Sequence, residues 1–120
     1  MSRINVLFVC GRNLRRSPTA ENLFSADARL SVRSVGTSDT SRRRITQKDL
    51  AWASLVLVME SKYEARIRAK FPDIENWPPF SDLDIPDDFE FMEPELIELL
   101  LPSVEDAITA YLEAMGNATG

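Results

Sequence analysis

The stretch Ile4–Pro18 reads INVLFVCGRNLRRSP, and it combines an apolar run, a polar loop and a helix-start signal. Ile4–Val9 is apolar except for Asn5 and rich in β-branched and aromatic residues, which is typical of a strand buried on both faces of a parallel sheet. Ser17-Pro18 predicts a helix start, with Ser17 as N-cap and Pro18 at the first helical position. The stretch therefore predicts a strand–loop–helix unit with Cys10 at the carboxyl end of the strand.

The rest of the chain continues this alternation of strands and helices. We expect the first helix to run to about Arg29, and further strands over Leu30–Val35, over Leu55–Met59 and near Phe80–Leu83. A short helix should run from the capping box Thr46–Asp49 through Ala53, and another, capped by Ser61, should run to about Phe71. Two last helices are expected near Pro94–Leu101 and Ser103–Met115, separated by Pro102. This order predicts a single three-layer α/β/α domain over residues 1–120, with a four-stranded parallel sheet. In such folds ligands bind beyond the carboxyl ends of the strands, which is where Cys10 is expected.

The composition excludes several classes of site. The chain has 120 residues, one Cys and no His. An internal disulfide and catalysis by a Ser/His or Cys/His pair are therefore excluded, and a metal site would depend on carboxylates. No apolar run approaches the ~18 residues of a membrane span, so we expect no membrane association. A single free thiol suits the reducing cytoplasm. The composition leaves the oligomeric state open.

Positive charge is concentrated around the Cys10 loop. All 14 Lys and Arg residues lie in residues 1–72, and the net charge of the chain is −5. The acidic balance argues against general binding of nucleic acid. Arg12, Arg15 and Arg16 lie in the loop, and Arg42–Arg44 form a second cluster. These clusters are either a solvated charged face or a site for an anionic substrate.

The residue types of the Cys10–Ser17 loop suit phosphate chemistry. A loop wrapped onto a helix N-terminus offers backbone N–H groups and the positive end of the helix dipole. Arg16 would grip two phosphate oxygens with its planar fork. The same field favours the nucleophilic thiolate form of Cys10, which the Ser17 hydroxyl would stabilise further. Asn13 suits a left-handed backbone position. The competing interpretation is that Cys10 is a small buried hydrophobic residue.

The order of motifs resembles that of the low-molecular-weight protein tyrosine phosphatases. The resemblance spans nearly the whole chain and rests on Asn5–Glu21, Ser34–Thr37, Ile45–Leu50, Val58–Glu60 and Asp84–Asp87. It implies that Cys10 is the nucleophile, that Arg16 clamps the phosphate and that Ser17 stabilises the thiolate. Gly11, Arg12, Asn13, Leu14 and Arg15 would complete the substrate-binding loop, and Asn13 and Ser34 would hold it in shape. The implied reaction requires no cofactor and no metal.

This chain differs from that family in the loop and beside it. Arg12 replaces the family's usual glycine, and Arg15 stands where many members have a second cysteine, so a vicinal disulfide cannot protect Cys10. Ser38–Arg44 replaces a longer helical segment that forms one wall of the family's substrate cleft. The substrate is therefore expected to be a phosphotyrosine protein or a small phosphomonoester, with a polyanionic ester as a further alternative.

Asp87 is the expected general acid. The resemblance aligns Asp84-Ile-Pro-Asp87 with the acid loop of the family, and Asp88 and then Asp84 are the alternatives. One carboxyl group near the cleft can protonate the leaving oxygen and later deprotonate a water molecule. Phe89 and Phe91 either line the cleft or pack into the core.

The expected reaction is hydrolysis of a phosphomonoester through a cysteinyl-phosphate. One alternative is an arsenate reductase that uses an external thiol, because a single cysteine excludes a relay through several. Another is a non-catalytic phosphate-binding module. Glu60 is expected only to start a helix, and Tyr63 to lie on that helix without evident chemistry.

Overall fold

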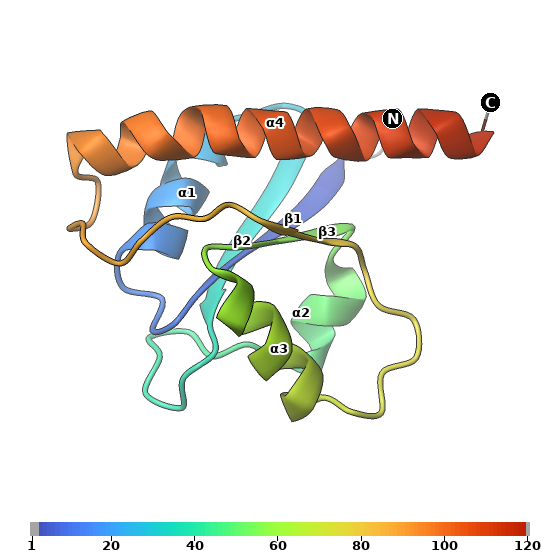
Figure 1. Ribbon diagram of the computed structural model, residues 1–120, viewed down its shortest axis with the longest axis horizontal. Helices are drawn as coiled ribbons and strands as arrows, with labels where there is room; N and C mark the ends of the chain where they lie inside the picture. The colour runs from blue at the N-terminus through green and yellow to red at the C-terminus, as the bar shows by residue number, and fades with distance from the viewer. Residues whose placement is uncertain (1–2, 120) are drawn as a thin grey trace.

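A central sheet of four parallel strands organises the computed structural model, which describes residues 3–119 (Figure 1). The strands are β1 (Ile4–Cys10), β2 (Leu30–Gly36), β3 (Leu55–Val58) and β4 (Phe80–Asp82). They lie in the order β2-β1-β3-β4, and each neighbouring pair is parallel. The predicted three-layer α/β/α fold is confirmed.

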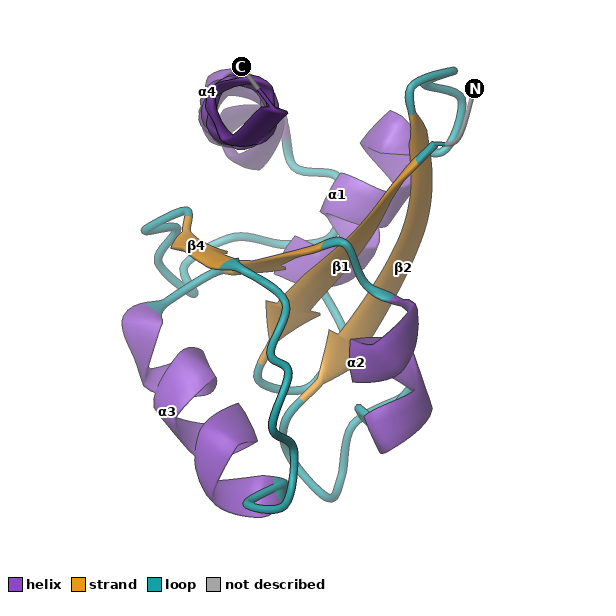
Figure 2. Ribbon diagram, turned by 90° about the vertical axis from the view of Figure 1, so that its right-hand side faces the viewer, coloured by secondary structure: helices purple, strands orange, loops and turns teal. Residues whose placement is uncertain are grey.

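Helices cover both faces of the sheet (Figure 2). α1 (Arg16–Phe24) and α4 (Pro94–Thr119) lie on one face, and α2 (Gln47–Trp52) and α3 (Ser61–Lys70) lie on the other. Because β1 is central and covered on both sides, its residues Val6–Val9 are 0% exposed. This burial explains why the strand is apolar without alternation. In the described part of the chain, no helix has both the length and the apolar character needed to cross a bilayer.

The prediction of two helices separated by Pro102 is wrong, because α4 continues through that proline. A proline inside a helix removes one hydrogen bond and costs about 3 kcal/mol. The free energy gained by burying apolar side chains of α4 is larger than this cost. Four of them recur at every fourth position and are each 0% exposed: Leu96, Leu100, Val104 and Ile108. Burial of each such side chain contributes about 1.5–3 kcal/mol. Packing on the sheet therefore keeps the helix continuous.

The predicted bounds of α1 are also wrong. The helix starts at Arg16 after Arg15, with no side-chain cap, and Ser17 lies inside its first turn. Instead of capping the helix, the Ser17 hydroxyl is hydrogen-bonded to the Cys10 sulfur. The helix ends at Phe24, because Asp27 turns the chain by accepting hydrogen bonds from the backbone and the side chain of Arg29.

The two later helix starts follow the sequence more closely. Thr46 and Asp49 form the expected capping box: the Thr46 hydroxyl accepts from Asp49 N at 3.3 Å, and the Asp49 carboxylate accepts from Thr46 N at 2.9 Å. The predicted cap at Ser61 is one residue late, since Glu60 is the N-cap of α3.

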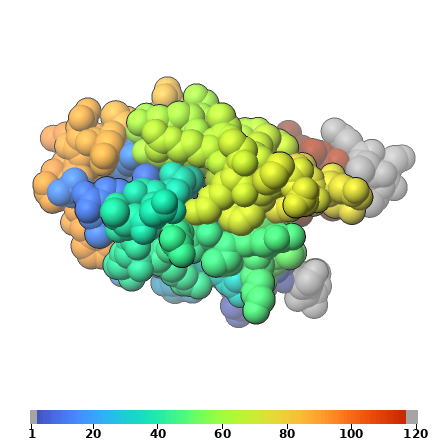
Figure 3. All heavy atoms as spheres, turned by 90° about the horizontal axis from the view of Figure 1, so that it is seen from below, coloured from blue at the N-terminus to red at the C-terminus, as the bar shows by residue number. Residues whose placement is uncertain are grey.

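The carboxyl ends of β1 and β2 meet, with Cys10 opposite Gly36 in the register. Beyond Gly36 the segment 37–44 turns back and forms a bridge between Arg44 and Gly36. Figure 3 looks onto this end of the sheet, where the loop after β1 (blue), the segment 37–44 (teal) and the chain near residues 85–92 (orange) adjoin. The predicted ligand-binding edge of the sheet is therefore formed by three segments that are distant in sequence.

Candidate active site

The carbonyl groups of the loop after β1 point outward, toward the segment 37–42. Thr37 N donates to Cys10 O at 3.1 Å, and Ser38 N donates to Gly11 O at 2.9 Å. Arg42 donates twice, from its backbone N to Arg12 O at 3.1 Å and from its Nε to Asn13 O at 3.1 Å. Across a planar trans peptide the following N–H points the opposite way. The amides of residues 11–14 therefore point into the loop, and such a ring of N–H groups forms an anion-binding concavity.

Cys10 is buried at the base of this ring, with 3% of the residue exposed. Its Sγ lies 2.9 Å from Ser17 Oγ and accepts from Asn13 N at 3.3 Å. Asn13 has a φ of 56°, which confirms the predicted left-handed position. Asn13 Nδ2 donates to Ser17 Oγ at 2.9 Å, and the hydroxyl proton of Ser17 faces two acceptors, the Cys10 sulfur at 2.9 Å and Val35 O at 3.4 Å. Two donors thus converge on Cys10 Sγ.

The Arg16 side chain is held from several sides and is 2% exposed. Its Nη1 donates to Glu60 Oε1 at 2.5 Å and to Ile85 O at 2.7 Å, and its Nη2 donates to the Tyr63 hydroxyl at 2.7 Å. A guanidinium carries five N–H donors, so Nε–H and one Nη2–H remain. Parallel N–H groups on Nε and Nη2 are the arrangement by which a guanidinium can bind two oxygens of one anion.

Glu60 and Tyr63 are site residues whose roles the sequence analysis missed. Glu60 starts α3 as predicted, but its carboxylate also pairs with Arg16, while Tyr63 is 3% exposed and its hydroxyl lies against the loop at Gly11. Their position follows from the strand pairing: β3 pairs with β1, and α3 begins directly beyond the carboxyl end of β3. Residues in the first turn of α3 therefore lie at the same edge of the sheet as Cys10.

The electrostatics of the Arg16 cluster favour its charged forms. Burial alone would lower the pKa of the Arg16 guanidinium, but the hydrogen bonds to Glu60 and Tyr63 and the charge of Asp87 outweigh burial and raise that pKa. Burial would likewise raise the pKa of the Glu60 carboxyl, yet the hydrogen bond and charge of Arg16, with Lys62, lower it. Arg16 and Glu60 thus remain an ion pair over the ordinary pH range.

Among the three candidate acids, Asp87 lines the cavity that contains Cys10. This cavity measures about 110 Å³ and is lined by Cys10, Gly11, Arg12, Leu14, Arg15, Arg16 and Asp87. Asp87 Oδ1 lies 3.6 Å from Arg16 Nε, on the side of the guanidinium whose Nε–H donates no hydrogen bond to any described residue. Asp88 and Asp84 do not line the cavity, and the Asp84 backbone instead bonds the Asp82 carboxylate.

The remaining predicted residues lie around the cavity. Ser34 is buried on β2 and donates to Glu21 Oε1 at 2.7 Å, so its hydrogen bond braces α1 and not the loop itself. Phe89 packs against the core, while Phe91 is 50% exposed. Arg15 pairs with Glu90 at 3.3 Å. Within residues 3–119 no group of three or more Cys, Asp or Glu side chains is arranged to hold a metal ion.

Known structures share this architecture. A low-molecular-weight protein tyrosine phosphatase of Streptococcus pyogenes, SP-PTP, has a TM-score of 0.72 at 20% identity, over 92% of this chain and 97% of that one. The YwlE arginine phosphatase of Geobacillus stearothermophilus has a TM-score of 0.64 at 23% identity, over 92% and 96%. The tyrosine phosphatase Wzb of Escherichia coli K30, in complex with phosphate, has a TM-score of 0.67 at 17% identity, over 88% and 96%.

No protein-family model and no curated protein sequence matches the chain. The similarity to the solved structures above shows that the chain has the fold of the low-molecular-weight protein tyrosine phosphatases. At these identities the likeness establishes the fold, whereas the chemistry of the site has to be argued from its own residues.

Proposed function

We propose that the protein is a cysteine-dependent phosphomonoester hydrolase that acts through a cysteinyl-phosphate. The observation that supports this proposal is that Cys10, Arg16 and Asp87 line one small cavity. In the proposed reaction they would serve as the nucleophile, the phosphate clamp and the acid. Two of the three are supported by neighbouring side chains. The Ser17 hydroxyl lies against the sulfur, and Glu60 and Tyr63 hold the guanidinium.

In the first step the Cys10 thiolate attacks the phosphorus atom of the bound monoester. A sulfur–phosphorus bond forms as the bond to the ester oxygen breaks, and Asp87 gives its proton to the departing oxygen. The inward amides of residues 11–14 and the Arg16 fork bind the three remaining oxygens, where negative charge develops.

In the second step Asp87, now a carboxylate, takes a proton from a water molecule that attacks the phosphorus. The sulfur–phosphorus bond breaks, inorganic phosphate leaves, and Cys10 returns to the thiolate. The Ser17 hydroxyl stabilises this thiolate as leaving group, because it can donate to the sulfur across 2.9 Å. The cycle returns every residue to its starting protonation state without a cofactor.

The proposed substrate is a phosphorylated protein, with phosphotyrosine as the first candidate and a small phosphomonoester as the second. The fold alone does not set the leaving group, since the similar structures include a tyrosine phosphatase and an arginine phosphatase. We also infer a reducing compartment such as the cytoplasm, because Cys10 must remain a free thiol to attack phosphorus. The whole of residues 1–120 would then act as one phosphatase-like domain.

Turnover of p-nitrophenyl phosphate by the wild type and by Cys10→Ser tests the proposal. We expect steady turnover by the wild type and loss of at least about a thousandfold in Cys10→Ser. Competitive inhibition by inorganic phosphate should accompany the turnover. Binding of phosphate by a folded wild type that shows no turnover would contradict the proposal and favour a phosphate-binding module.

A further inference from the structure

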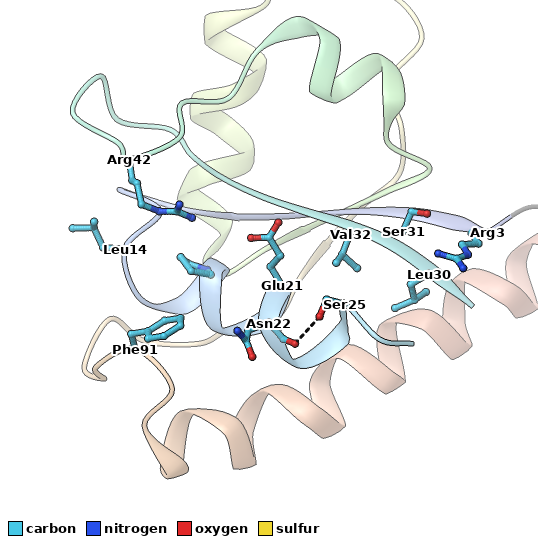
Figure 4. A pocket seen from close by; sticks show the side chains of 11 residues that line it. Arg3, Leu14, Glu21, Asn22, Ser25, Leu30, Ser31, Val32, Arg42 and Phe91 are labelled. Atoms are coloured by element: carbon cyan, nitrogen blue, oxygen red, sulfur yellow. Dashed lines mark hydrogen bonds between the residues drawn. The ribbon is translucent and has the colours of Figure 1, made fainter. Parts of the chain in front are cut away.

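A groove runs along α1 and the outer edge of β2, starting beside the catalytic cavity (Figure 4). It has a volume of about 760 Å³ and is much larger than the cavity around Cys10. α1 contributes Pro18, Glu21 and Asn22, and β2 contributes Leu30, Ser31 and Val32. A volume of this size lies in the range of ligand-binding sites.

Leu14 joins this groove to the catalytic cavity, because it lines both. Its side chain is exposed by 43%, and Phe91, at the same end of the groove, is exposed by 50%. Two large apolar side chains at the rim of a phosphate site offer contacts that a free phosphate cannot use. A ligand that fills the cavity can therefore extend past Leu14 into the groove.

The groove lining has two arginines, Arg3 and Arg42, and one carboxylate, Glu21, so its net charge is positive. Arg42 lies near the Leu14 end and Arg3 lies at the opposite end (Figure 4). In the described part of the chain, neither guanidinium has a carboxylate oxygen within 4.0 Å, whereas Arg15, Arg29, Arg33 and Arg44 each have at least one. The one carboxylate in the lining, Glu21, accepts a hydrogen bond from Ser34.

Arg42 is also fixed in place. Its Nε donates to Asn13 O at 3.1 Å and its backbone N donates to Arg12 O at 3.1 Å, so the two terminal nitrogens are left to contact a ligand. A guanidinium that is already ordered loses less entropy when it binds an anion.

The β2 strand supplies an open edge along the groove. Its carboxyl end is covered, because Gly36 N donates to Arg43 O and Ile45 N donates to Gly36 O. Within residues 3–119, no strand pairs with the outer edge of Leu30–Val35. An extended peptide can add to such an edge through main-chain hydrogen bonds, while side-chain contacts provide selectivity.

From these observations we propose that the groove binds an extended segment of a phosphoprotein substrate that carries acidic residues beside the phosphorylated residue. The proposal rests on the proposed phosphatase function and adds the substrate class. The phosphoryl group would enter the Cys10 cavity, and the flanking chain would pass Leu14 and Phe91. Its carboxylates would pair with Arg42 close to the cavity and with Arg3 at the far end.

Peptide binding can be measured without turnover, so one experiment tests the groove and a different one tests the phosphatase activity. The probes are peptides with a non-hydrolysable phosphonate analogue of phosphotyrosine, flanked either by glutamates or by alanines, and affinity is read from fluorescence anisotropy. We expect the glutamate peptide to bind about tenfold more tightly at low salt, and the preference to shrink as salt screens the charges. Lack of p-nitrophenyl phosphate turnover contradicts the phosphatase proposal alone, whereas equal peptide affinities contradict the groove alone.

Two variants locate the preference within the groove. Arg3→Ala removes the distant charge and should reduce the glutamate preference by about threefold to fivefold. Asn22→Trp places a bulky side chain at a groove position and should abolish the preference. Lys48→Ala is the matched control, because it removes one exposed positive charge from α2 on the opposite face of the sheet.

Each outcome decides the proposal. A preference that persists in both groove variants would overturn it, since arginines at the cavity mouth would then carry the selectivity. So would an Asn22→Trp variant that binds both peptides normally but changes the oligomeric state, because the groove would then be an interface between copies. Melting curves of the variants confirm that each is folded.

Discussion

Arg16 Nη2 donates a 2.7 Å hydrogen bond to the Tyr63 hydroxyl, which links the first residue of α1 to the first turn of α3. Tyr63→Phe leaves that N–H unpaired in a buried site and frees the guanidinium to turn. An unsatisfied buried donor costs about 1–3 kcal/mol. We expect the inhibition constant of inorganic phosphate and the KM for p-nitrophenyl phosphate to rise about tenfold, with a smaller fall in kcat. Tyr111→Phe, on α4, is the matched control, and unchanged phosphate affinity in Tyr63→Phe would contradict a positioning role.

Asp87→Asn should reduce kcat by about a hundredfold to ten-thousandfold, because Asp87 lines the Cys10 cavity and would supply the proton for the leaving oxygen. The loss should be larger for phenyl phosphate than for p-nitrophenyl phosphate, whose leaving group needs protonation less. Asp88→Asn serves as the control, since this neighbour does not line the cavity and should keep nearly full activity. Equal losses in the two variants would disprove the assignment.

Glu60→Gln should destabilise the protein by about 1–3 kcal/mol near neutral pH, because the charged hydrogen bond to Arg16 is lost. The folded-state pKa of Glu60 is lowered from its ordinary value of 4.5. The stabilisation is therefore fully present above that ordinary value and is lost as the pH falls through the lowered folded-state pKa. Urea unfolding of both proteins should show a difference that shrinks below about pH 4.5.

The corresponding change at Glu64 provides the control for that experiment. Glu64 pairs with Arg68 on the surface of α3, where both side chains are exposed to solvent. Pairs of this kind contribute about 0.3–0.5 kcal/mol. A Glu60→Gln difference that is equally small, or that does not change with pH, would contradict the role of the Arg16 pair.

Cys10 is the only cysteine of the chain, so alkylation by iodoacetamide reports on this sulfur alone. Ser17→Ala removes the hydroxyl that lies 2.9 Å from Sγ, and the thiolate loses a donor. We expect the alkylation rate near neutral pH to fall about tenfold, and added phosphate to protect the wild type. Mass spectrometry measures the modified fraction over time. Equal rates in the two proteins would show that the hydroxyl does not stabilise the thiolate.

Gly36 tests the close packing of the loop against β2. A Cβ at this position would collide with Ser41 Oγ and would lie 2.8 Å from Gly11 O, which is backbone of the loop after β1. Gly36→Ala should therefore destabilise the protein by about 1–3 kcal/mol and weaken phosphate binding. Gly116→Ala is the matched control, because a Cβ there meets nothing within 4 Å. Alanine favours a helix over glycine, so this second change should be neutral or stabilising.

The loop after β1 and its strand could be predicted from local sequence because their determinants are local. Val6–Val9 had to be a buried strand since it offers no polar face, and Asn13 suited the left-handed position that it occupies. Cys10, Arg16 and Ser17 are separated by a few residues, so one loop brings them together. The capping box at Thr46 was readable for the same reason.

Other features depended on contacts between distant residues. Pro102 predicted a helix break from local chemistry, but the burial of Leu96–Ile108 on the sheet outweighed the lost hydrogen bond. Glu60 and Tyr63 had no local signature of a site, since their partner Arg16 lies 44 and 47 residues earlier in the chain. The choice of Asp87 over Asp88 as the candidate acid likewise required knowing which of the two residues lines the cavity.

By itself the sequence determined that a cysteine lies at the end of a buried parallel strand and that an arginine follows within one short segment, because residue type and spacing over that segment suffice for that. Only the tertiary structure decided what surrounds the loop. The pairing of β1 with β2 and β3 brings the segment 37–42, α3 and Asp87 to one edge of the sheet. These contacts orient the loop amides, hold the arginine fork and leave open the groove beside them, and none of them is encoded in neighbouring residues.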